Sequence, residues 1–171
     1  ATLQNVQPGE TGKLQFALQT LECPLWGPIE AKAYVVINDQ PIYTDEYAIT
    51  IKAELKEDFS KMTVEELQQA PIIDVKIPNL DTLKANKKYN ARLTISNAGI
   101  NPLVIRRIIT SDETITITAP KATIKGGRKT DINMQINTAG LEAGNYSRMV
   151  TIITNDPKKS ILKLSLNWVV E

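Results

Sequence analysis

The sequence predicts an all-β fold of two packed sheets, and three observations support this prediction. Of its 171 residues, 47 are Ile, Val or Thr, whose branched side chains favour extended backbone and pack well on a pleated sheet. Several segments alternate apolar and polar residues, which is the period of a half-buried strand. Turn residues separate these segments at spacings of roughly ten residues, which is typical of a β-sandwich.

Between Lys88 and the C-terminus, the predicted strands follow one another closely. Asn97-Ala98-Gly99 ends the first strand, Gly126-Gly127 precedes the fourth, and Asn155-Asp156-Pro157 precedes the last, because these residues readily adopt turn geometry. The last strand alternates most clearly, so we expect Trp168 in the core. In total we expect six or seven strands, among them 89–95, 102–109, 114–118, 132–136, 146–154 and 162–170.

The segment before these strands has a different pattern and predicts a short helix. Thr63 and Glu66 have the spacing of a capping box, in which each side chain binds the other residue's backbone N–H. Pro71 cannot continue a helix, so one or two turns are expected. A short acidic helix between two β regions indicates a linker, which we place at residues 59–70.

Residues 1–58 repeat part of the pattern found in the second half of the chain. Turns match turns and apolar runs match apolar runs, while the offset between the copies falls from 118 to 115 positions. The matched segments, in order, are 6–10 with 124–128, 16–20 with 134–138, 38–39 with 155–156, and 49–51 with 164–166.

The repeat predicts the domain organisation. Residues 71–171 would be a complete sandwich, and residues 1–58 would be the C-terminal half of a first one, without its N-terminal strands. Half a sandwich exposes the inner faces of its strands, which is energetically costly. We therefore expect that the natural chain extends N-terminally or that something else covers this face. An intact, well-packed domain built from residues 1–58 alone would contradict the repeat.

The motif Leu93 to Gly99, followed by Pro102 to Arg106, resembles the core of an uncharacterised bacterial family of immunoglobulin-like repeats. Those domains are similar to the ASH (Hydin-type) and major-sperm-protein sandwiches. Thr154 to Pro157 and the lead-in Glu65 to Pro71 continue the resemblance, which covers about 100 residues well. It implies tandem immunoglobulin-like β-sandwich domains with a short helical linker, an architecture that specifies fold better than function.

The resemblance also implies a cellular location. Members of the family are mainly secreted or envelope-associated, often with a lipoprotein-type leader, so an extracytoplasmic location is expected and a lipid anchor upstream of residue 1 is compatible with it. The chain departs from the family at one point. Members often carry a Cys-Gly-Cys motif after the second strand, whereas this chain has Ser111 to Thr114 there, so no thiol chemistry can be carried over.

Composition argues against an enzyme. The chain has no histidine and a single cysteine, Cys23, which has no adjacent activating residue, so we interpret it as a structural or incidental thiol. A hydrolase without histidine would need a Ser–Lys pair or two carboxylates facing each other across a cleft. Adjacent acidic residues on a strand point to opposite faces, so we interpret the acidic pairs as solvated charges. We expect no catalytic residue, no metal, no cofactor and no small-molecule substrate. The four pairs of adjacent acidic residues are 45–46, 57–58, 65–66 and 112–113.

The charges are divided between the two halves of the chain. Residues 1–70 hold 5 basic and 11 acidic residues, whereas residues 71–171 hold 15 and 8. The halves could therefore attract each other, while the net charge of +1 gives no general attraction to nucleic acid. Alternatively, basic residues could form one face for an anionic surface, or could simply protect strand edges from aggregation. The residues of that face would be Lys84, Lys87, Lys88, Arg92, Arg106 and Arg107.

The candidate binding residues are Trp26, Arg106 and Arg107. We predict a non-catalytic extracytoplasmic spacer or protein-interaction module of the bacterial cell envelope, whose partners are other proteins or neighbouring immunoglobulin-like domains. Trp26 would either cover the end of a core or bind a ligand with its ring. The alternative function is a carbohydrate-binding module of a secreted system, which would need Trp26, Tyr34, Tyr43 and Tyr47 exposed on one face.

Overall fold

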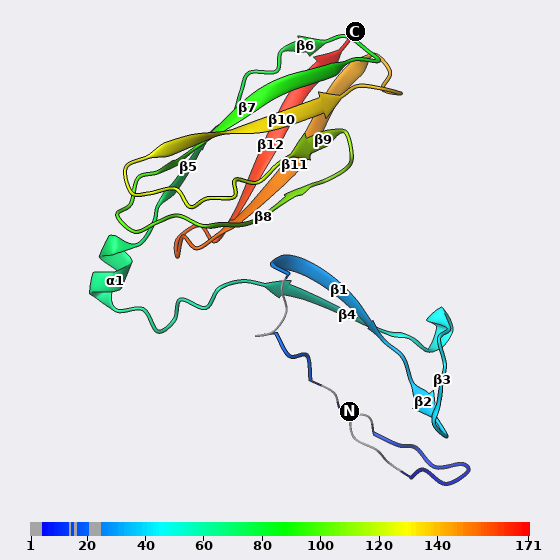
Figure 1. Cartoon of the computed structure of the whole chain (residues 1–171). Helices are drawn as coiled ribbons and strands as arrows, with labels where there is room; N and C mark the ends of the chain where they lie inside the picture. The colour runs from blue at the N-terminus through cyan, green and yellow to red at the C-terminus, as the bar shows by residue number, and fades with distance from the viewer. Residues whose placement is uncertain (1–4, 14, 16, 21–24) are drawn as a thin grey trace.

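Two four-stranded sheets pack face to face in the C-terminal part of the chain. The computed structural model describes residues 5–13, 15, 17–20 and 25–171 (Figure 1). One sheet has the order β5 (Ile73–Lys76), β7 (Lys88–Asn97), β10 (Lys129–Asn137), β9 (Ile115–Ile117). The other has the order β6 (Thr82–Leu83), β12 (Ile161–Val170), β11 (Gly144–Thr154), β8 (Ile105–Thr110). All neighbours are antiparallel except β6 and β12, and we call these two sheets the sandwich.

The core of the sandwich lies between the two sheets. Alternation along each strand sends every second side chain inward, so that β7, for example, buries Leu93 and Ile95 completely. The facing sheet contributes Val150 and Leu166, which are also fully buried, and burying each such side chain contributes about 1.5–3 kcal/mol. Trp168 is 3% exposed, which confirms its predicted place in the core.

From Lys88 onward the sandwich has six strands, as the sequence predicted, and β5 and β6 before Lys88 bring its total to eight. The short strands β5 and β6 were missed because two to four residues are too few to show alternation. The second predicted strand, 102–109, begins only at Ile105. Just before it, the backbone N–H of Val104 donates to Asn155 Oδ1 at 2.7 Å instead of to a neighbouring strand.

Helix α1 (Val64–Gln69) has the predicted capping box. The N–H of Glu66 donates to Thr63 Oγ1 at 3.2 Å, and the N–H of Thr63 donates to Glu66 Oε2 at 2.8 Å. The end of the helix is attached to the sandwich, because the N–H of Asn101 donates to the carbonyl of Gln69 at 2.8 Å.

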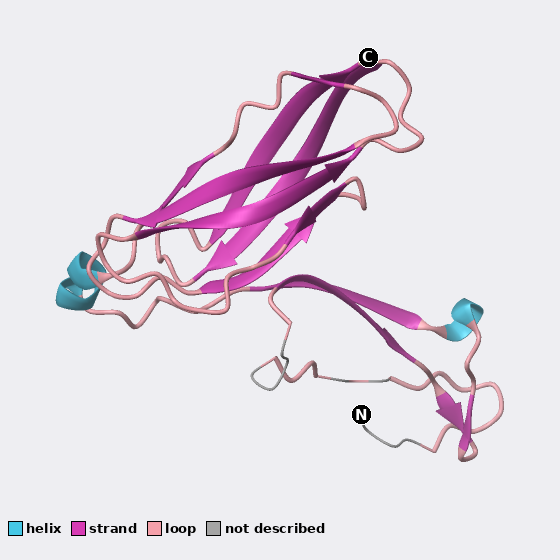
Figure 2. Cartoon of the chain, turned by 45° about the horizontal axis from the view of Figure 1, so that its top comes forward, coloured by secondary structure: helices cyan, strands magenta, loops and turns pink. Residues whose placement is uncertain are grey.

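The N-terminal part of the chain forms an open two-stranded ribbon. Strands β1 (Gly27–Ala33) and β4 (Ile49–Leu55) pair antiparallel, with Gly27 opposite Leu55, and we call this pair the ribbon. Between them lie the hairpin β2 (Val36–Ile37) and β3 (Gln40–Pro41) and the one-turn helix η1 (Asp45–Tyr47). Figure 2 shows the ribbon as a long extension beside the sandwich.

The ribbon has no packed core of its own among the described residues. Within residues 5–58, Gly27 is the one described residue that is buried, and it is buried against the sandwich. The described residues of this segment therefore form no well-packed domain of the kind that would contradict the repeat. The division into two sandwiches with a linker stays a prediction.

Among the described residues, no helix has the length and hydropathy needed to cross a membrane. Cys23 lies outside the described residues.

Candidate functional site

The three candidate binding residues come together at one place, where the ribbon meets the sandwich. The guanidinium of Arg106 lies 5.0 Å from the centroid of the Trp26 ring, and its Nη2 donates to Glu57 Oε2 at 2.9 Å. The neighbouring Arg107 donates from Nη1 to the backbone carbonyl of Trp26 at 3.1 Å. We call these four residues the junction cluster. They bind one another within the chain.

Strand pairing explains why the cluster assembles. Trp26 directly precedes β1 and Glu57 follows β4 by two residues, so the antiparallel pairing brings both to the same end of the ribbon. The two arginines lie on β8, an outer strand of the second sheet of the sandwich. The ribbon therefore contacts the sandwich through its end.

An apolar contact accompanies the charged one. Gly27 has φ +83 and lies against the side chains of Ile153 and Ile109, so closely that a Cβ at this position would collide with Ile153. Ile153 is fully buried, but it does not belong to the core between the two sheets. On β11, Val150 and Ile152 point into that core, so the side chain of Ile153 points to the opposite face. The ribbon thus covers an isoleucine on the outer face of the second sheet, and both the close contact and the positive φ at position 27 favour glycine.

The junction cluster joins the acidic and the basic half of the chain. Glu57 belongs to the acidic half and Arg106 to the basic half, so this ion pair fits one of the alternatives that the charge distribution left open, attraction between the halves. The two side chains are 31% and 30% exposed, so water screens the ion pair, which contributes less than about 1 kcal/mol. The Arg106–Trp26 contact adds a similar amount, about 0.5–1 kcal/mol.

The six basic residues expected on one face do not gather there. Arg92 lies on β7 in the first sheet, whereas Arg106 and Arg107 lie on β8 in the second sheet. Lys84 follows β6, whose Leu83 pairs with Val170, at the end of the second sheet far from Arg107. The alternative of a single basic face is therefore wrong, because the alternation and crossovers of a sandwich distribute these residues over two layers.

The aromatic residues expected in one row are divided as well. Trp26 lies at one end of β1 under Arg106, and Tyr34 lies just beyond the other end. Tyr34 and Tyr43 pack edge to face with their centroids 5.3 Å apart, and Tyr43 and Tyr47 are 73% and 55% exposed. A carbohydrate site, if built here, would use the three tyrosines and not Trp26.

The acidic pairs are engaged by partners other than each other. Asp45 accepts a hydrogen bond from Lys32 at 2.6 Å, and this contact raises the pKa of Lys32 above its ordinary value. Glu66 caps α1, Glu57 binds Arg106, and Asp112 forms an ion pair with Arg148. In the described part of the chain, no group of three His, Cys, Asp or Glu side chains is placed to hold a metal ion.

A cluster that the sequence did not indicate surrounds Arg148. Its guanidinium lies 5.4 Å from the ring centroid of Tyr146 and 5.9 Å from that of Trp168, and the two rings stack at 6.1 Å. Tyr146 and Trp168 are directly opposite on β11 and β12. The alternation of the strand could have predicted from the sequence that Arg148 and Tyr146 share a face. Asp112, the ion-pair partner of Arg148, lies in a loop, where no periodic pattern indicates its position.

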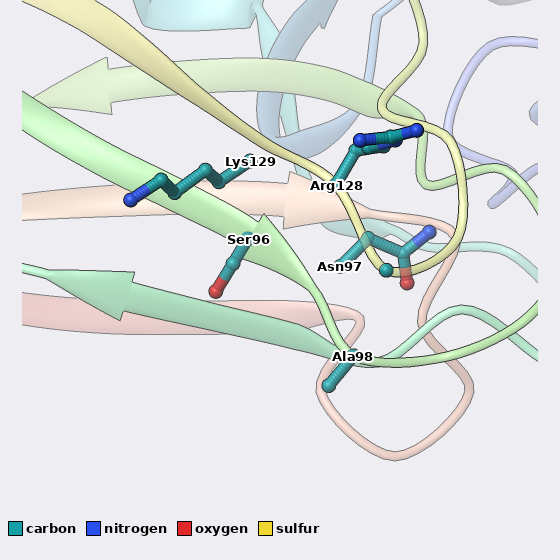
Figure 3. Close-up of a pocket in the computed structure, with 6 residues that line it drawn as sticks. Ser96, Asn97, Ala98, Arg128 and Lys129 are labelled. Atoms are coloured by element: carbon teal, nitrogen blue, oxygen red, sulfur yellow. The ribbon is translucent and has the colours of Figure 1, made fainter.

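A surface hollow of about 470 Å³ lies where β7 ends and β10 begins (Figure 3). Its lining side chains do not converge, since Arg128 and Lys129 point in different directions in Figure 3. The one buried polar side chain there, Asn97, is fully used within the protein. Asn97 Oδ1 accepts from the N–H groups of Ile72 and Gly99, and Nδ2 donates to the carbonyls of Asn101 and Ile124, at 2.8–3.1 Å.

The other motif residues also stabilise the fold. Asp156 is 1% exposed and accepts hydrogen bonds from the N–H groups of Ile73 and Lys158 at 2.9 and 2.8 Å. A Cβ on Gly99 would collide with the carbonyl oxygen of Ala70, so this glycine permits the close approach of two backbone segments. The motif therefore encodes the way in which the loops at this end of the sandwich interlock.

These observations define a class: an all-β, two-sheet sandwich whose motif residues are structural. The family model described as "Protein of unknown function (DUF1573)" matches residues 72–169, which is more than half of the chain. The chain belongs to this family, which confirms the resemblance to an uncharacterised family noted in the sequence. A search of curated proteins finds no match.

One solved structure has the same fold at low sequence identity, and others match with lower scores. A protein of unknown function from Porphyromonas gingivalis W83 matches with a TM-score of 0.61 and 16% identity, over 85% of this chain and 66% of that chain. A match of that extent must include much of the region before residue 72. The ASH/PapD-like domain 7 of human CEP192 has a TM-score of 0.41 and 8% identity, over 70% of this chain and 95% of that one. The SrpA adhesin of Streptococcus sanguinis has a TM-score of 0.45 and 6% identity, over 60% of this chain and 58% of that one.

Proposed function

We propose that this protein is a non-catalytic, extracytoplasmic module of the bacterial cell envelope that acts as a spacer and binds other proteins. The observation that carries the proposal is the junction cluster. Its aromatic and basic side chains bind one another and thereby fix the ribbon to the sandwich. A spacer needs a fixed geometry between its parts, and the buried contact of Gly27 with Ile153 adds to the same attachment.

The fixed geometry can be tested with two spin labels in a Cys23→Ser background. One label replaces Thr50 on the exposed face of the ribbon, and the other replaces Asn133 on the exposed face of β10. We expect a narrow distribution of label-to-label distances, which becomes broad in Arg106→Ala. The matched control is Arg92→Ala, which removes the same charge from the other sheet and should leave the distribution narrow. A broad distribution in the unsubstituted chain would contradict the spacer.

The location can be tested separately in cells of the organism that encodes the chain. We expect an antibody against residues 71–171 to detect the protein in the envelope or the culture medium. Recovery only with cytoplasmic markers would exclude an extracytoplasmic role.

A second candidate, carbohydrate binding, is favoured by the exposed tyrosines near the tip of the ribbon. Stacking of a sugar on Tyr43 would be expected to quench tyrosine fluorescence during titration with oligosaccharides. Binding that Tyr43→Phe retains and Tyr43→Ala loses would support this function. Tyrosine fluorescence that no oligosaccharide changes would contradict carbohydrate binding by the exposed tyrosines.

A further inference from the structure

The end of the sandwich at which β7 finishes carries an exposed isoleucine on interlocked loops. Ile100 is 67% exposed, although it follows directly after the loop residues that the motif holds in place. On one side, Gly99 lies against the backbone of Ala70, and on the other side the carbonyl of Ile100 occupies the space of a Cβ on Gly126. Neighbouring loops therefore fix the backbone around Ile100, and an apolar side chain is exposed to water on a firmly held part of the molecule.

Basic side chains gather in the loops at the same end. The loop of residues 118–128 contacts the backbone of Ile100, as described above. The loop of residues 155–160 is joined to this end by Asn155, whose Oδ1 accepts from the N–H of Val104 at 2.7 Å. Together with the first residue of β10, these loops contribute six exposed cations, none of which forms an ion pair with another described residue. They are Lys121, Lys125, Arg128, Lys129, Lys158 and Lys159.

The acidic side chains at this end are fewer than the cations. Asp156 is buried, Asp74 lies on β5, and Glu65 and Glu66 lie on α1. The net charge of this end is therefore positive. Helix α1 lies beside the loops in both Figure 1 and Figure 2. Because its two glutamates would be repelled by an anionic surface, Ile100 is the apolar residue of this end that can approach such a surface most favourably.

We propose that this end of the sandwich docks onto the surface of an anionic phospholipid bilayer, with Ile100 in the interface and the six cations on the lipid phosphates. We call Ile100 and the six cations the docking end. It shares no residue with the basic face that the structure excluded. The proposal goes beyond the proposed function and does not depend on the spacer, because vesicle binding is measured whether or not the ribbon is fixed to the sandwich.

The arrangement of the docking end favours a bilayer over other anionic ligands. Arg128 and Lys129 point in different directions in Figure 3, so the cations do not converge on one small anion. A bilayer places a layer of phosphates above an apolar layer, which matches an exposed apolar side chain with cations around it. A nucleic acid would satisfy the cations but offers no apolar layer to Ile100. A protein partner would need about 800 Å² of contact, which one isoleucine does not supply.

The first test measures binding of the 171-residue chain to vesicles by sedimentation. We expect binding to vesicles of phosphatidylglycerol and phosphatidylcholine, weakening as salt is added, and little binding to phosphatidylcholine alone. Lys125→Glu combined with Arg128→Glu should weaken binding roughly 10-fold or more. The matched control, Lys87→Glu combined with Lys88→Glu, makes the same charge change at the opposite end of β7 and should retain most of the binding.

The second test asks whether Ile100 enters the interface. In a Cys23→Ser background, an environment-sensitive fluorophore on Ile100→Cys should shift its emission to the blue when anionic vesicles are added. The same fluorophore on Val36→Cys, at a position of the ribbon that is 59% exposed, should not shift. Ile100→Ser should weaken vesicle binding roughly 10-fold, whereas Val36→Ser should leave it unchanged.

Four results would overturn the proposal. The first is no binding to anionic vesicles, and the second is equal weakening by the two pairs of charge reversals. The third is an unshifted emission at position 100 together with equally tight binding of soluble polyphosphate, which would make a soluble anion the ligand. The fourth is loss of vesicle binding in a longer natural form of the protein, which would mean that other residues of the same chain cover the docking end. A broad spin-label distribution together with vesicle binding would contradict the spacer and support the docking end.

Discussion

The ribbon β1–β4 and the pair β11–β12 share one register, since Gly27 pairs with Leu55 as Gly144 pairs with Val170, but they differ in burial. Their central apolar positions, Ile51 and Leu166, are half-buried and fully buried, respectively. Alternation fixes the register in both, because a shift by one residue would move every side chain to the opposite face. Burial instead depends on the second sheet, which is present over β11–β12 and absent among the described residues around the ribbon. Register is thus a local property of these strands, and stability comes from the layer that covers them.

The largest expected effect compares equivalent positions in the two pairs. Leu166→Ala leaves a cavity between two sheets and should lower the free energy of unfolding by about 2–5 kcal/mol. Ile51→Ala removes a side chain that already contacts water and should cost less than about 1 kcal/mol. Urea unfolding followed by circular dichroism measures both. Equal losses would mean that the ribbon is covered as thoroughly as β11–β12.

The next effect concerns the buried amide that interlocks the loops of the sandwich. Asn97→Ala leaves the buried carbonyl of Ile124 and the partly buried N–H of Ile72 without their partner and should cost about 2–4 kcal/mol. Asn133→Ala, on the exposed face of β10, should change stability by less than about 0.5 kcal/mol. The ribbon has no comparable buried polar anchor among its described residues. A small loss in Asn97→Ala would show that water replaces the amide.

A third, smaller effect tests the attachment between the two regions. Gly27 and Gly140 both have positive φ, so replacement by alanine strains the backbone at each by about 1–2 kcal/mol. Only at Gly27 does the added Cβ also collide with Ile153, whereas Gly140 has open space. Gly27→Ala should therefore release the ribbon, raise the exposure of Trp26 and leave the sandwich folded. Acrylamide quenching of tryptophan fluorescence, with Trp168→Phe as background, measures this release.

An unchanged quenching constant in Gly27→Ala would indicate that the contact with Ile153 is not needed for docking. A similar rise in Gly140→Ala would indicate that backbone strain, and not the collision, causes the change.

The comparison also shows which features the sequence could predict. Alternation, turn residues and the capping box are local signals, so the long strands, α1 and the core position of Trp168 were predicted. Contacts between segments far apart in sequence leave no such signal. For this reason the charge distribution indicated an attraction between the halves, but not the pairing of Arg106 with Glu57 and Trp26. The same limit applies to Asp156, which the sequence presented only as a turn residue, although it binds Ile73 across the sandwich.

The smallest expected effect concerns the connection between the ribbon and α1. The N–H of Ser60 donates to Asp58 Oδ1 at 2.9 Å and, with a smaller contribution from the Ser60 hydroxyl, lowers the pKa of Asp58 below its ordinary value of 3.8. A carboxyl whose pKa is lower in the folded state than in the unfolded state stabilises the folded state at every pH above its unfolded pKa. This contribution is lost as the pH falls through the folded pKa.

Ser60→Pro, which removes the N–H, should return the pKa of Asp58 towards 3.8 in an NMR titration. Ser60→Ala keeps the N–H and should retain most of the shift. An equal return in both variants would assign the effect to the hydroxyl. Because Asp58 is exposed and lies outside both compared regions, acid should loosen this turn while the sandwich remains folded.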